Sequence, residues 1–549
     1  MRKKTKNREA KIPKSAIRIP LTIGICGHRE LATPENEVRD ELDRVWAFLR
    51  RKFPNTPFVV LDSLAEGADR LVLKTLPRNI PYVAVLPFAA ERFKEDFADD
   101  RSRAEFDELL AGAARTVVAG ERPRDYSAAS RYVVEHSDLL LALWDMESDL
   151  RNCRSGGVPP LGGTWDSVNL ALASGTTGFP DERRPVEIVH VPVRRRNGAD
   201  AAASAPTRFR ILKPGTECIP EVIRPECWLP AEEWILCDRL NRKCRRSAKE
   251  TPRMSEFTGG VNVKEIRTDV ARFAFFSGLA SRVRRRQKRE FAVIYAAAIL
   301  LGVALLVCQK CGIGLPAKIP LRPYALFLAC TWLYFKWYLA KQERSDWHLL
   351  SRSIAEGLRI GIFWRLWGLP DPVADSFPEG TRYLIRIFRN WELLSVPPRL
   401  DMSARVLQCW ILRQRRWLEQ RIAAARRKDR WCRGIRWGVL IAAALAAGIC
   451  LLLQRDTPSP LPALSWKEIA LGTFAAGMLL SSCAEFFRQK KAWLRLADFY
   501  EVSHRNFDYA ARNYAHFSPE ERAEAVRKLG IRALQENSKW QGLRRELRQ

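Results

Sequence analysis

Apolar and charged positions follow two different patterns along this chain of 549 residues. Between residue 17 and about residue 215, short apolar runs alternate with charged segments whose apolar positions recur at helical spacing. This alternation is typical of β-strands that are joined by helices into a parallel sheet. Further along, at 341–430 and 488–549, apolar positions recur every three or four residues, which predicts helices. The sequence therefore predicts an α/β domain followed by an all-α region.

Six apolar runs in the first region are expected to be strands, and they cover residues 17–26, 58–63, 82–86, 116–119, 138–144 and 186–192. Ligands of parallel sheets bind where the strands end, because backbone N–H groups and helix N-termini attract anions there. The residues near these ends are therefore the candidate ligand-binding residues: Gly27, His28, Arg29, Glu66, Gly67, Asp69, Arg70, Trp144, Asp145, Gly162, Gly163 and Thr164.

These residue types suit an anionic ligand that carries a ribose or a purine base. Gly27 permits a tight turn, and the helix that begins after Gly162 offers free amides to a phosphate or diphosphate. Trp144 or Phe88 is expected to stack on a base. Each feature also has an ordinary structural explanation, since Gly-Gly-Thr is a common helix cap and residues 66–70 are able to form a surface ion pair. Their common position after strands favours a site.

The segments GICGHRE, SLAEGADRL, LLALWD and GGTWDSV occur in this order within residues 17–195, and together they resemble the SLOG superfamily of Rossmann-like domains. Members of that superfamily include sensors of nucleotide ligands, LOG-type phosphoribohydrolases and the cytosolic domain of melastatin-type cation channels. Further along, a basic helix, a two-span hairpin and the segments AEGLR and FWR resemble the SLATT group of membrane effectors. Such effectors accompany nucleotide-sensing modules in bacterial antiviral defence. The resemblance implies a Rossmann-like fold, a nucleotide-derived or NAD-derived ligand and no further cofactor.

The same resemblance bears on catalysis. LOG-type hydrolases carry the motif PGGxGTxxE, whose final Glu is the catalytic acid, and the matching stretch of this chain places Ser167 at that position. Asp166 would replace the missing acid only if the helix register shifted. The domain is therefore expected to bind its ligand without hydrolysing it, with no catalytic residue and no metal site. Two alternatives remain open: a membrane-tethered nucleotide hydrolase that uses Glu66 or Asp69 with His28, and a membrane scaffold without a ligand.

Four apolar runs of about 17–19 residues are expected to cross a membrane, and they lie at 291–308, 323–340, 437–453 and 469–487. At about 1.5 Å per residue, such a helix is close to the thickness of a bilayer core. Basic residues precede the first and third runs and follow the second and fourth, so the positive-inside rule places both termini in the cytoplasm. The expectation is a multi-pass protein of the inner membrane. The alternative is that these runs are buried helices of a large soluble protein.

The formal net charge of +30, from 92 Lys and Arg against 62 Asp and Glu, indicates an anionic partner. The basic flanks of the spans account for most of this excess, and the chain has no zinc, helix-turn-helix or RNA-binding motif that would indicate nucleic acid. The expected partners are a nucleotide-derived small molecule, membrane lipid and further copies of the chain in a homo-oligomer. Lys336 and Glu485 lie inside the spans near their ends, where they either snorkel to the surface or line or gate a pore.

The chain is therefore expected to sense a ligand in the cytosol and to act on the membrane. Ligand binding would reorient or oligomerise the cytosolic domains, and the assembled spans would perturb or perforate the inner membrane. The expected parts are a basic tail (1–16), a ligand-binding domain (17–215), a linker with a basic helix (216–290), a first transmembrane hairpin (291–340), a cytosolic helical region (341–430), a second hairpin (431–487) and a C-terminal cytosolic helical region (488–549).

Overall fold

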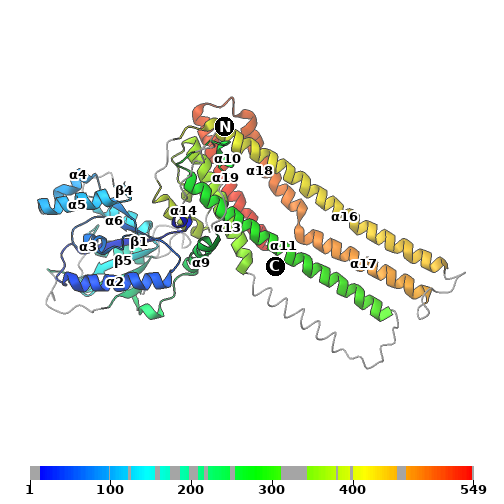
Figure 1. Ribbon diagram of the computed structural model, residues 1–549, viewed down its shortest axis with the longest axis horizontal. Coiled ribbons are helices and arrows are strands. Elements are labelled where there is room, and N and C mark those ends of the chain that lie inside the picture. The colour runs from blue at the N-terminus through cyan, green and yellow to red at the C-terminus, as the bar shows by residue number, and fades with distance from the viewer. Residues whose placement is uncertain are drawn as a thin grey trace, which may run out of the picture. The chain divides into compact units, whose positions relative to one another are not determined.

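The structure is a computed structural model in which the chain forms two compact units (Figure 1). The first unit comprises Met1–Lys249 and Asp371–Pro398, and the second comprises Glu250–Pro370 and Arg399–Gln549. The described residues are 13–97, 99–120, 125–154, 161–173, 186–196, 208–214, 220–247, 254–261, 263–310, 343–378, 381–395, 400–453 and 465–546.

An eight-stranded mixed sheet lies at the centre of the first unit. Its strands are β1 (Leu21–Gly27), β2 (Phe58–Asp62), β3 (Tyr82–Leu86), β4 (Arg115–Val118), β5 (Leu139–Trp144), β6 (Glu187–Pro192), β7 (Arg210–Lys213) and β8 (Glu221–Ile223). They are arranged in the order β4-β3-β2-β1-β5-β6-β7-β8. The first six strands pair in parallel, which confirms the predicted parallel sheet, whereas β7 and β8 add an antiparallel edge that was not predicted.

Helices cover both faces of this sheet, so its central strands β2 and β5 are buried along their whole length. Successive residues of β2 point to opposite faces: Val60 belongs to one apolar core, and Val59 and Leu61 belong to the other. The first core includes α2 (Glu35–Lys52), α3 (Ala68–Thr75), α4 (Ala90–Phe93) and α5 (Asp100–Gly112), and the second includes α6 (Tyr126–Glu135) and α8 (Thr164–Leu172). The remaining helices of the unit are α1 (Lys14–Ile17), α7 (Met146–Arg154), α9 (Glu232–Ser247) and α14 (Arg382–Glu392), with short 3₁₀ turns at Lys94–Asp96, Pro225–Cys227 and Ala374–Ser376.

Two of these helices, α9 and α14, lie outside the expected ligand-binding domain but complete the first unit at the amino ends of its strands. In α9, the Asn241 side chain accepts a hydrogen bond from Ile19 N–H and donates one to Ile19 O, both at 2.8 Å. In α14, Asn390 Nδ2 donates to Pro20 O at 3.0 Å and to Asp138 Oδ2 at 2.6 Å. The unit therefore extends beyond the expected domain boundary and includes a piece of the helical region.

Every regular element of the second unit, within the residues that the structure describes, is a helix. Its elements are α10 (Ser255–Thr258), α11 (Arg267–Lys310), α13 (Glu343–Trp367), α15 (Ser403–Val406), a π-helical turn (Leu407–Leu412), α16 (Arg413–Leu453), α17 (Trp466–Lys491), α18 (Trp493–Asn513) and α19 (Pro519–Glu546). Helices α16 and α17 run side by side as a long hairpin (Figure 1). They approach closely at Gly477, where an added Cβ would lie 2.1 Å from Ala443 Cβ. Small residues of this kind allow two helices to pack backbone to backbone.

Two stretches of the described chain, Ser403–Leu453 and Trp466–Asn513, are long and apolar enough to cross a membrane. Only 6% and 17% of their most apolar parts are buried inside the protein. A core helix of a soluble protein would be mostly buried, so these values disagree with the alternative of buried helices. The exposed apolar side chains include Trp437, Ile441, Leu445, Ile449, Leu452, Leu471, Phe474 and Met478.

The first expected hairpin is described only in part. Residues 291–308 form the last part of α11, whereas the second expected span at 323–340, with Lys336, lies outside the described residues. The structure therefore shows two helices able to cross a membrane, both from the second expected hairpin, and does not show four.

Candidate ligand site at the carboxyl edge of the sheet

Four segments that the sequence singled out converge at the carboxyl ends of β1 and β5. These strands are neighbours, and His28 N–H donates to Leu143 O of β5 at 3.3 Å. The loop before α3 joins them, because Ala68 N–H donates to His28 O at 3.1 Å. The start of α8 approaches the same point, with Thr164 Oγ1 at 3.4 Å from His28 Nδ1. The convergence follows from parallel pairing, which brings the carboxyl ends of the strands to one edge.

His28 is the polar centre of this edge and is buried. Its Nε2 accepts a hydrogen bond from Asp145 N–H at 2.9 Å and lies 3.5 Å from an Arg195 guanidinium nitrogen. Because both of these groups are donors, Nε2 is the unprotonated nitrogen, and Nδ1 carries the hydrogen that faces Thr164. Burial and the charge of Arg195 lower the pKa of His28 to about 4. The ring is therefore neutral at physiological pH.

This tautomer bears on the hydrolase alternative. A general base must have a free acceptor that is able to take a proton from the attacking group. The only acceptor nitrogen of His28 already receives the Asp145 N–H. The arrangement thus uses His28 as a link between β1, β5 and α8, and not as a base.

Asp145 fixes the segment that follows β6. Its Oδ1 accepts hydrogen bonds from Ser148 N–H at 3.3 Å and from the Arg194 guanidinium at 3.2 Å, and its Oδ2 accepts Arg195 N–H at 3.2 Å. Burial alone would raise the pKa of Asp145, but the hydrogen bonds from Arg195 and Ser148 and the charge of Arg194 lower it. The carboxylate therefore stays ionised, and it caps the start of α7.

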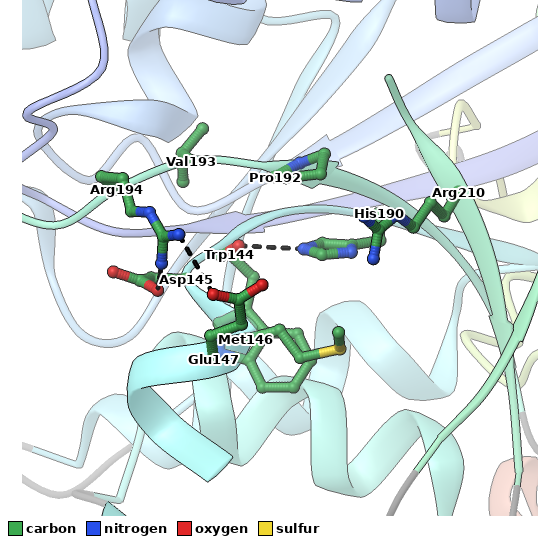
Figure 2. Close-up of a pocket in the computed structure, with 9 residues that line it drawn as sticks. All are labelled: Trp144, Asp145, Met146, Glu147, His190, Pro192, Val193, Arg194 and Arg210. Carbon is green, nitrogen blue, oxygen red and sulfur yellow. Dashed lines mark hydrogen bonds and ion pairs between the residues drawn. The ribbon is translucent and has the colours of Figure 1, made fainter. Parts of the chain in front are cut away.

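Arg194 and Arg195 are not among the residues that the sequence pattern predicts at the site. Arg194 bridges Asp145 and Glu147, as Figure 2 shows, and Arg195 forms an ion pair with Asp149. Their position in the sequence does indicate a role at the site, because they lie two and three residues after the expected strand 186–192, just as the predicted site residues lie after other strands. Arg194 and Arg195 bring two guanidinium groups to the carboxyl edge, each of which is paired with a carboxylate in this conformation.

A shallow pocket lies beside the ends of β5 and β6 (Figure 2), and its lining residues are Trp144, Asp145, Met146, Glu147, His190, Pro192, Val193, Arg194 and Arg210. His190 is buried, and its Nε2–H donates to Trp144 O at 2.9 Å. Burial lowers the pKa of His190 to about 4, so this ring is also neutral. Its Nδ1 is buried and has no hydrogen-bond partner among the described residues.

The two aromatic residues expected to stack on a base are buried instead. Trp144 is 1% exposed, its Nε1–H donates to Asp149 Oδ2 at 2.6 Å, and its ring packs against Trp165 and His190. Phe88 is 5% exposed and packs among other aromatic rings. Neither ring offers an open face to a base in this conformation, which corrects the expected stacking role.

The glycine turn before α8 is closed by its own aspartate. Gly162 has a positive φ of 77°, and its N–H donates to Asp166 Oδ2 at 2.8 Å. Asp166 therefore stabilises the glycine turn, and its side chain does not occupy the position of the missing catalytic acid. Ser167, which stands where a LOG-type hydrolase has its acid, is buried with its hydroxyl donating to Gly163 O at 3.3 Å.

The loop before α3 has a backbone that only particular residues tolerate. Gly67 has a φ of 83°, and a Cβ at this position would lie 2.0 Å from Arg29 O. Leu64 also has a positive φ, 59°, which is strained for a branched side chain. Its N–H donates to Asp62 Oδ1 at 2.7 Å, which stabilises the turn. The loop is thereby pressed against the residues that follow β1.

Two carboxyl groups, Asp62 and Asp69, are buried beneath this loop. Burial raises the pKa of Asp69 to about 7, although the Ser63 hydroxyl donates to its Oδ2 at 2.6 Å. Burial and the nearby Asp69 raise the pKa of Asp62 well above its ordinary value. Two neighbouring buried carboxyl groups resist double ionisation, so the pair retains a proton near neutral pH.

Arg70 and Glu66 are tied to α5. Arg70 is 2% exposed, its Nε donates to Leu64 O at 3.1 Å, and its Nη1 donates to Ser102 O at 2.9 Å and to Glu105 at 3.1 Å. Glu66 accepts a hydrogen bond from the Ser102 hydroxyl. Asp69 and Arg70 therefore hold the loop from inside the domain, and they do not form the surface ion pair that was the ordinary explanation. Arg29, by contrast, is exposed.

The last expected site residue, Glu485, lies at one end of the α16–α17 hairpin. Its carboxylate accepts hydrogen bonds from Arg436 of α16 at 2.9 Å and from Arg488 of α17 at 2.7 Å. Arg488 also pairs with the buried Asp429 at 3.1 Å. Glu485 is thus part of an ion-pair network at this end of the hairpin.

Comparisons with protein-family models, curated proteins and solved structures find no match to this chain. Among the described residues, no group of three or more His, Cys, Asp or Glu side chains is placed to hold a metal ion. The resemblance to SLOG domains and SLATT effectors therefore rests on the quoted sequence segments alone.

Proposed function

We propose that this protein is a membrane-anchored sensor and effector that binds a nucleotide-derived or NAD-derived anion at the carboxyl edge of its sheet. The observation that carries the proposal is the convergence of His28, Thr164, Arg195 and the loop at Gly67 at that edge. The N-terminus of α8 and the guanidinium groups of Arg29 and Arg195 supply positive potential for a phosphate. The resemblance to SLOG domains supplies the class of ligand.

The proposed effector is the helical unit. The uncovered apolar side chains of α16 and α17 contact lipid, and together with the expected hairpin at 291–340 they form a multi-pass region of the inner membrane with both termini in the cytoplasm. Ligand binding promotes assembly of several copies, and the assembled spans perturb or perforate the membrane. By its resemblance to SLATT effectors, the protein serves in bacterial antiviral defence.

The proposal is tested with the full-length chain purified in a neutral detergent. Thermal unfolding is followed with nucleotides and with linear and cyclic NAD-derived compounds, and mass spectrometry analyses each mixture. We expect the midpoint to rise with an intact ligand, by an amount that grows with ligand concentration. Appearance of a new product would instead support the hydrolase, and no shift with any compound would support the scaffold; either result contradicts the sensor.

Arg195 provides the matched variant for this experiment. Arg195→Gln removes a cation that lies near His28, and we expect it to weaken ligand affinity at least tenfold, because a charge-assisted hydrogen bond to phosphate is lost. Arg196→Gln makes the same change in charge one residue further on, at an exposed side chain, and we expect less than a twofold effect. Equal effects of the two variants would contradict the proposed position of the site.

Insertion in the membrane is tested separately. Membranes that contain the full chain are washed with alkaline carbonate, and we expect the chain to stay in the pellet. Its complete release would contradict the membrane part of the proposal.

A further inference from the structure

Five positively charged side chains gather in the second unit, and we name them the cationic cluster: Arg284 and Lys288 of α11, Arg352 of α13, and Arg421 and Lys428 of α16. Arg284 and Lys288 are one helical turn apart, and Arg421 and Lys428 are two turns apart, so each pair lies on one face of its helix. The electrostatic neighbours of Arg284 include Arg352 and Arg421, and those of Lys288 include Arg284, Arg421 and Lys428. Three helices thus direct positive charge to one place.

Aromatic rings hold part of this cluster in position. The Arg421 guanidinium lies over the Trp417 ring at 5.1 Å, and the Arg352 guanidinium lies over the Trp540 ring at 4.9 Å. Trp417 in turn packs edge-on against Tyr500, which is itself an electrostatic neighbour of Arg284. Cation–π contacts of this kind orient a guanidinium without neutralising it. The cluster is therefore built to keep its charge.

Several other cations on α11 and α16 are paired with carboxylates, unlike these members of the cluster. Arg286 pairs with Glu290 at 2.9 Å, Arg426 pairs with Glu501 at 2.8 Å, and Arg433 pairs with Asp429 at 3.0 Å. Within the part of the chain that the structure describes, no carboxylate lies at ion-pair distance from Arg284, Lys288 or Arg421. Partial burial and the charges of Arg352 and Arg421 lower the pKa of Arg284, and Arg284 is the main cause of the lowered pKa of Lys288.

A cluster of like charges costs stability unless an anion occupies it. We propose that the cationic cluster binds a phosphate-bearing polyanion, and that the headgroup of an anionic phospholipid is its source. Lys288 lies only three residues before Phe291, where the first expected span begins. If the proposed membrane topology holds, the cluster lies at the level of the headgroups of the cytoplasmic leaflet, where anionic lipids attract basic segments.

The test uses the full-length chain in a neutral detergent and three probes: dioctanoyl phosphatidic acid, dioctanoyl phosphatidylcholine and inorganic tripolyphosphate. Binding is measured by thermophoresis. We expect phosphatidic acid to bind at least tenfold more tightly than phosphatidylcholine, and Arg284→Gln/Arg421→Gln to remove that preference. Without an added anion, we expect the same double variant to unfold about 1–2 °C higher than the unchanged chain, because repulsion is relieved.

The matched control is Arg286→Gln/Arg427→Gln, which removes the same total charge from the same two helices outside the cluster. We expect it to change binding less than twofold. If tripolyphosphate also binds and its binding depends on Arg284 and Arg421, the site is confirmed and the anions it binds include soluble polyphosphates. If only the lipid binds, the bound anion is a lipid headgroup of the membrane. Equal weakening in both double variants, or no preference for either phosphate probe over phosphatidylcholine, would overturn the site. These readouts do not involve Arg195 or any nucleotide, so failure of the sensor proposal leaves them interpretable.

Discussion

The central sheet has two polar sides, the carboxyl edge where its parallel strands end and the amino edge where they begin, and different parts of the chain contact them. At the carboxyl edge, the contacts come from segments that directly follow strands, such as His28 after β1 and Asp145 after β5. At the amino edge, they come from the side chains of Asn241 and Asn390, which lie 222 and 370 residues away in sequence from Ile19 and Pro20. The candidate ligand site is therefore encoded locally, whereas the opposite edge depends on helices contributed from far along the chain.

The difference also appears in the charges at each edge. At the carboxyl edge, the buried Asp145 receives the charge of Arg194 and three hydrogen bonds from N–H groups. At the amino edge, the buried Asp138 accepts hydrogen bonds from Thr22 N–H at 2.9 Å and Asn390 Nδ2 at 2.6 Å, and the charge of Arg386 also lowers its pKa. At Asp138 the effect of burial outweighs these interactions, whereas at Asp145 the hydrogen bonds from Arg195 and Ser148 and the charge of Arg194 outweigh burial. The two aspartates consequently have pKa values shifted in opposite directions.

The largest effect on stability is expected when the hydrogen bonds between α14 and the amino edge are removed. Asn390→Leu removes hydrogen bonds to Pro20 O and to Asp138 Oδ2 and leaves a buried carboxylate with one donor fewer. We expect the free energy of unfolding of the first unit to fall by about 4 kcal/mol. Hydrogen exchange measured by mass spectrometry would show protection of β1 and β5 reduced roughly 10³-fold.

The neighbouring residue provides the control for this change. Arg389 forms an ion pair with Asp375 in which both side chains are well exposed. Arg389→Gln is therefore expected to change protection less than about fivefold, since exposed ion pairs contribute little. Similar losses in the two variants would show that α14 is held by its charge and not by Asn390.

The second effect is on the pH dependence of stability. Burial raises the pKa of Asp138 to about 6, so between its ordinary value and pH 6 the folded chain keeps a proton that the unfolded chain releases. Stability is then lost as the pH rises through this window, by up to about 3 kcal/mol. We expect Asp138→Asn to raise the midpoint of thermal unfolding relative to the unchanged chain, by about 6 °C more at pH 7 than at pH 4.

For Asp145 we expect stability to change with pH in the opposite direction. Its pKa is lowered in the folded chain, so its contribution is complete above its ordinary value and is lost as the pH falls below it. Asp145→Asn is expected to flatten the stability curve only below about pH 4. A parallel response of the two variants between pH 4 and pH 7 would contradict the contrast between the edges.

These comparisons explain how much of the fold the sequence reveals. The six parallel strands and the face of α2 formed by Val38, Leu42 and Leu49 are predictable, because both depend on periodicity within a short segment. β1 begins at Leu21 and not at residue 17, directly after Pro20, which lacks an N–H. The short edge strands β7 and β8, and the attachment of α9 and α14, depend on distant pairing that no local pattern encodes.

For the candidate site, too, only part of the arrangement could be predicted from the local sequence pattern. Its position at the carboxyl edge follows from parallel topology, and the residues expected there do converge. The direction of each side chain does not follow, because a strand-end residue is free to point outward or inward. The side chains of Asp69 and Arg70 point inward and form hydrogen bonds with Ser63 and Leu64 inside the domain, which no local pattern in the sequence indicates.

The smallest of the three effects concerns the loop at the carboxyl edge. Gly67→Ala places a side chain at a φ of 83° and a Cβ 2.0 Å from Arg29 O. We expect the free energy of unfolding of the first unit to fall by about 2 kcal/mol, from the left-handed backbone and the contact with Arg29 together. The midpoint of thermal unfolding should fall by about 4 °C.

Gly260→Ala separates these two causes, because Gly260 also has a positive φ, 103°, but an added Cβ there meets nothing within 4 Å. We expect Gly260→Ala to lower the free energy of unfolding of the second unit, which contains Gly260, by about half as much, since only the backbone term remains. Equal costs would mean that the residues after β1 move aside easily. In that case the backbone at the carboxyl edge is able to shift, and the close contact between Gly67 and Arg29 does not determine the shape of the ligand site.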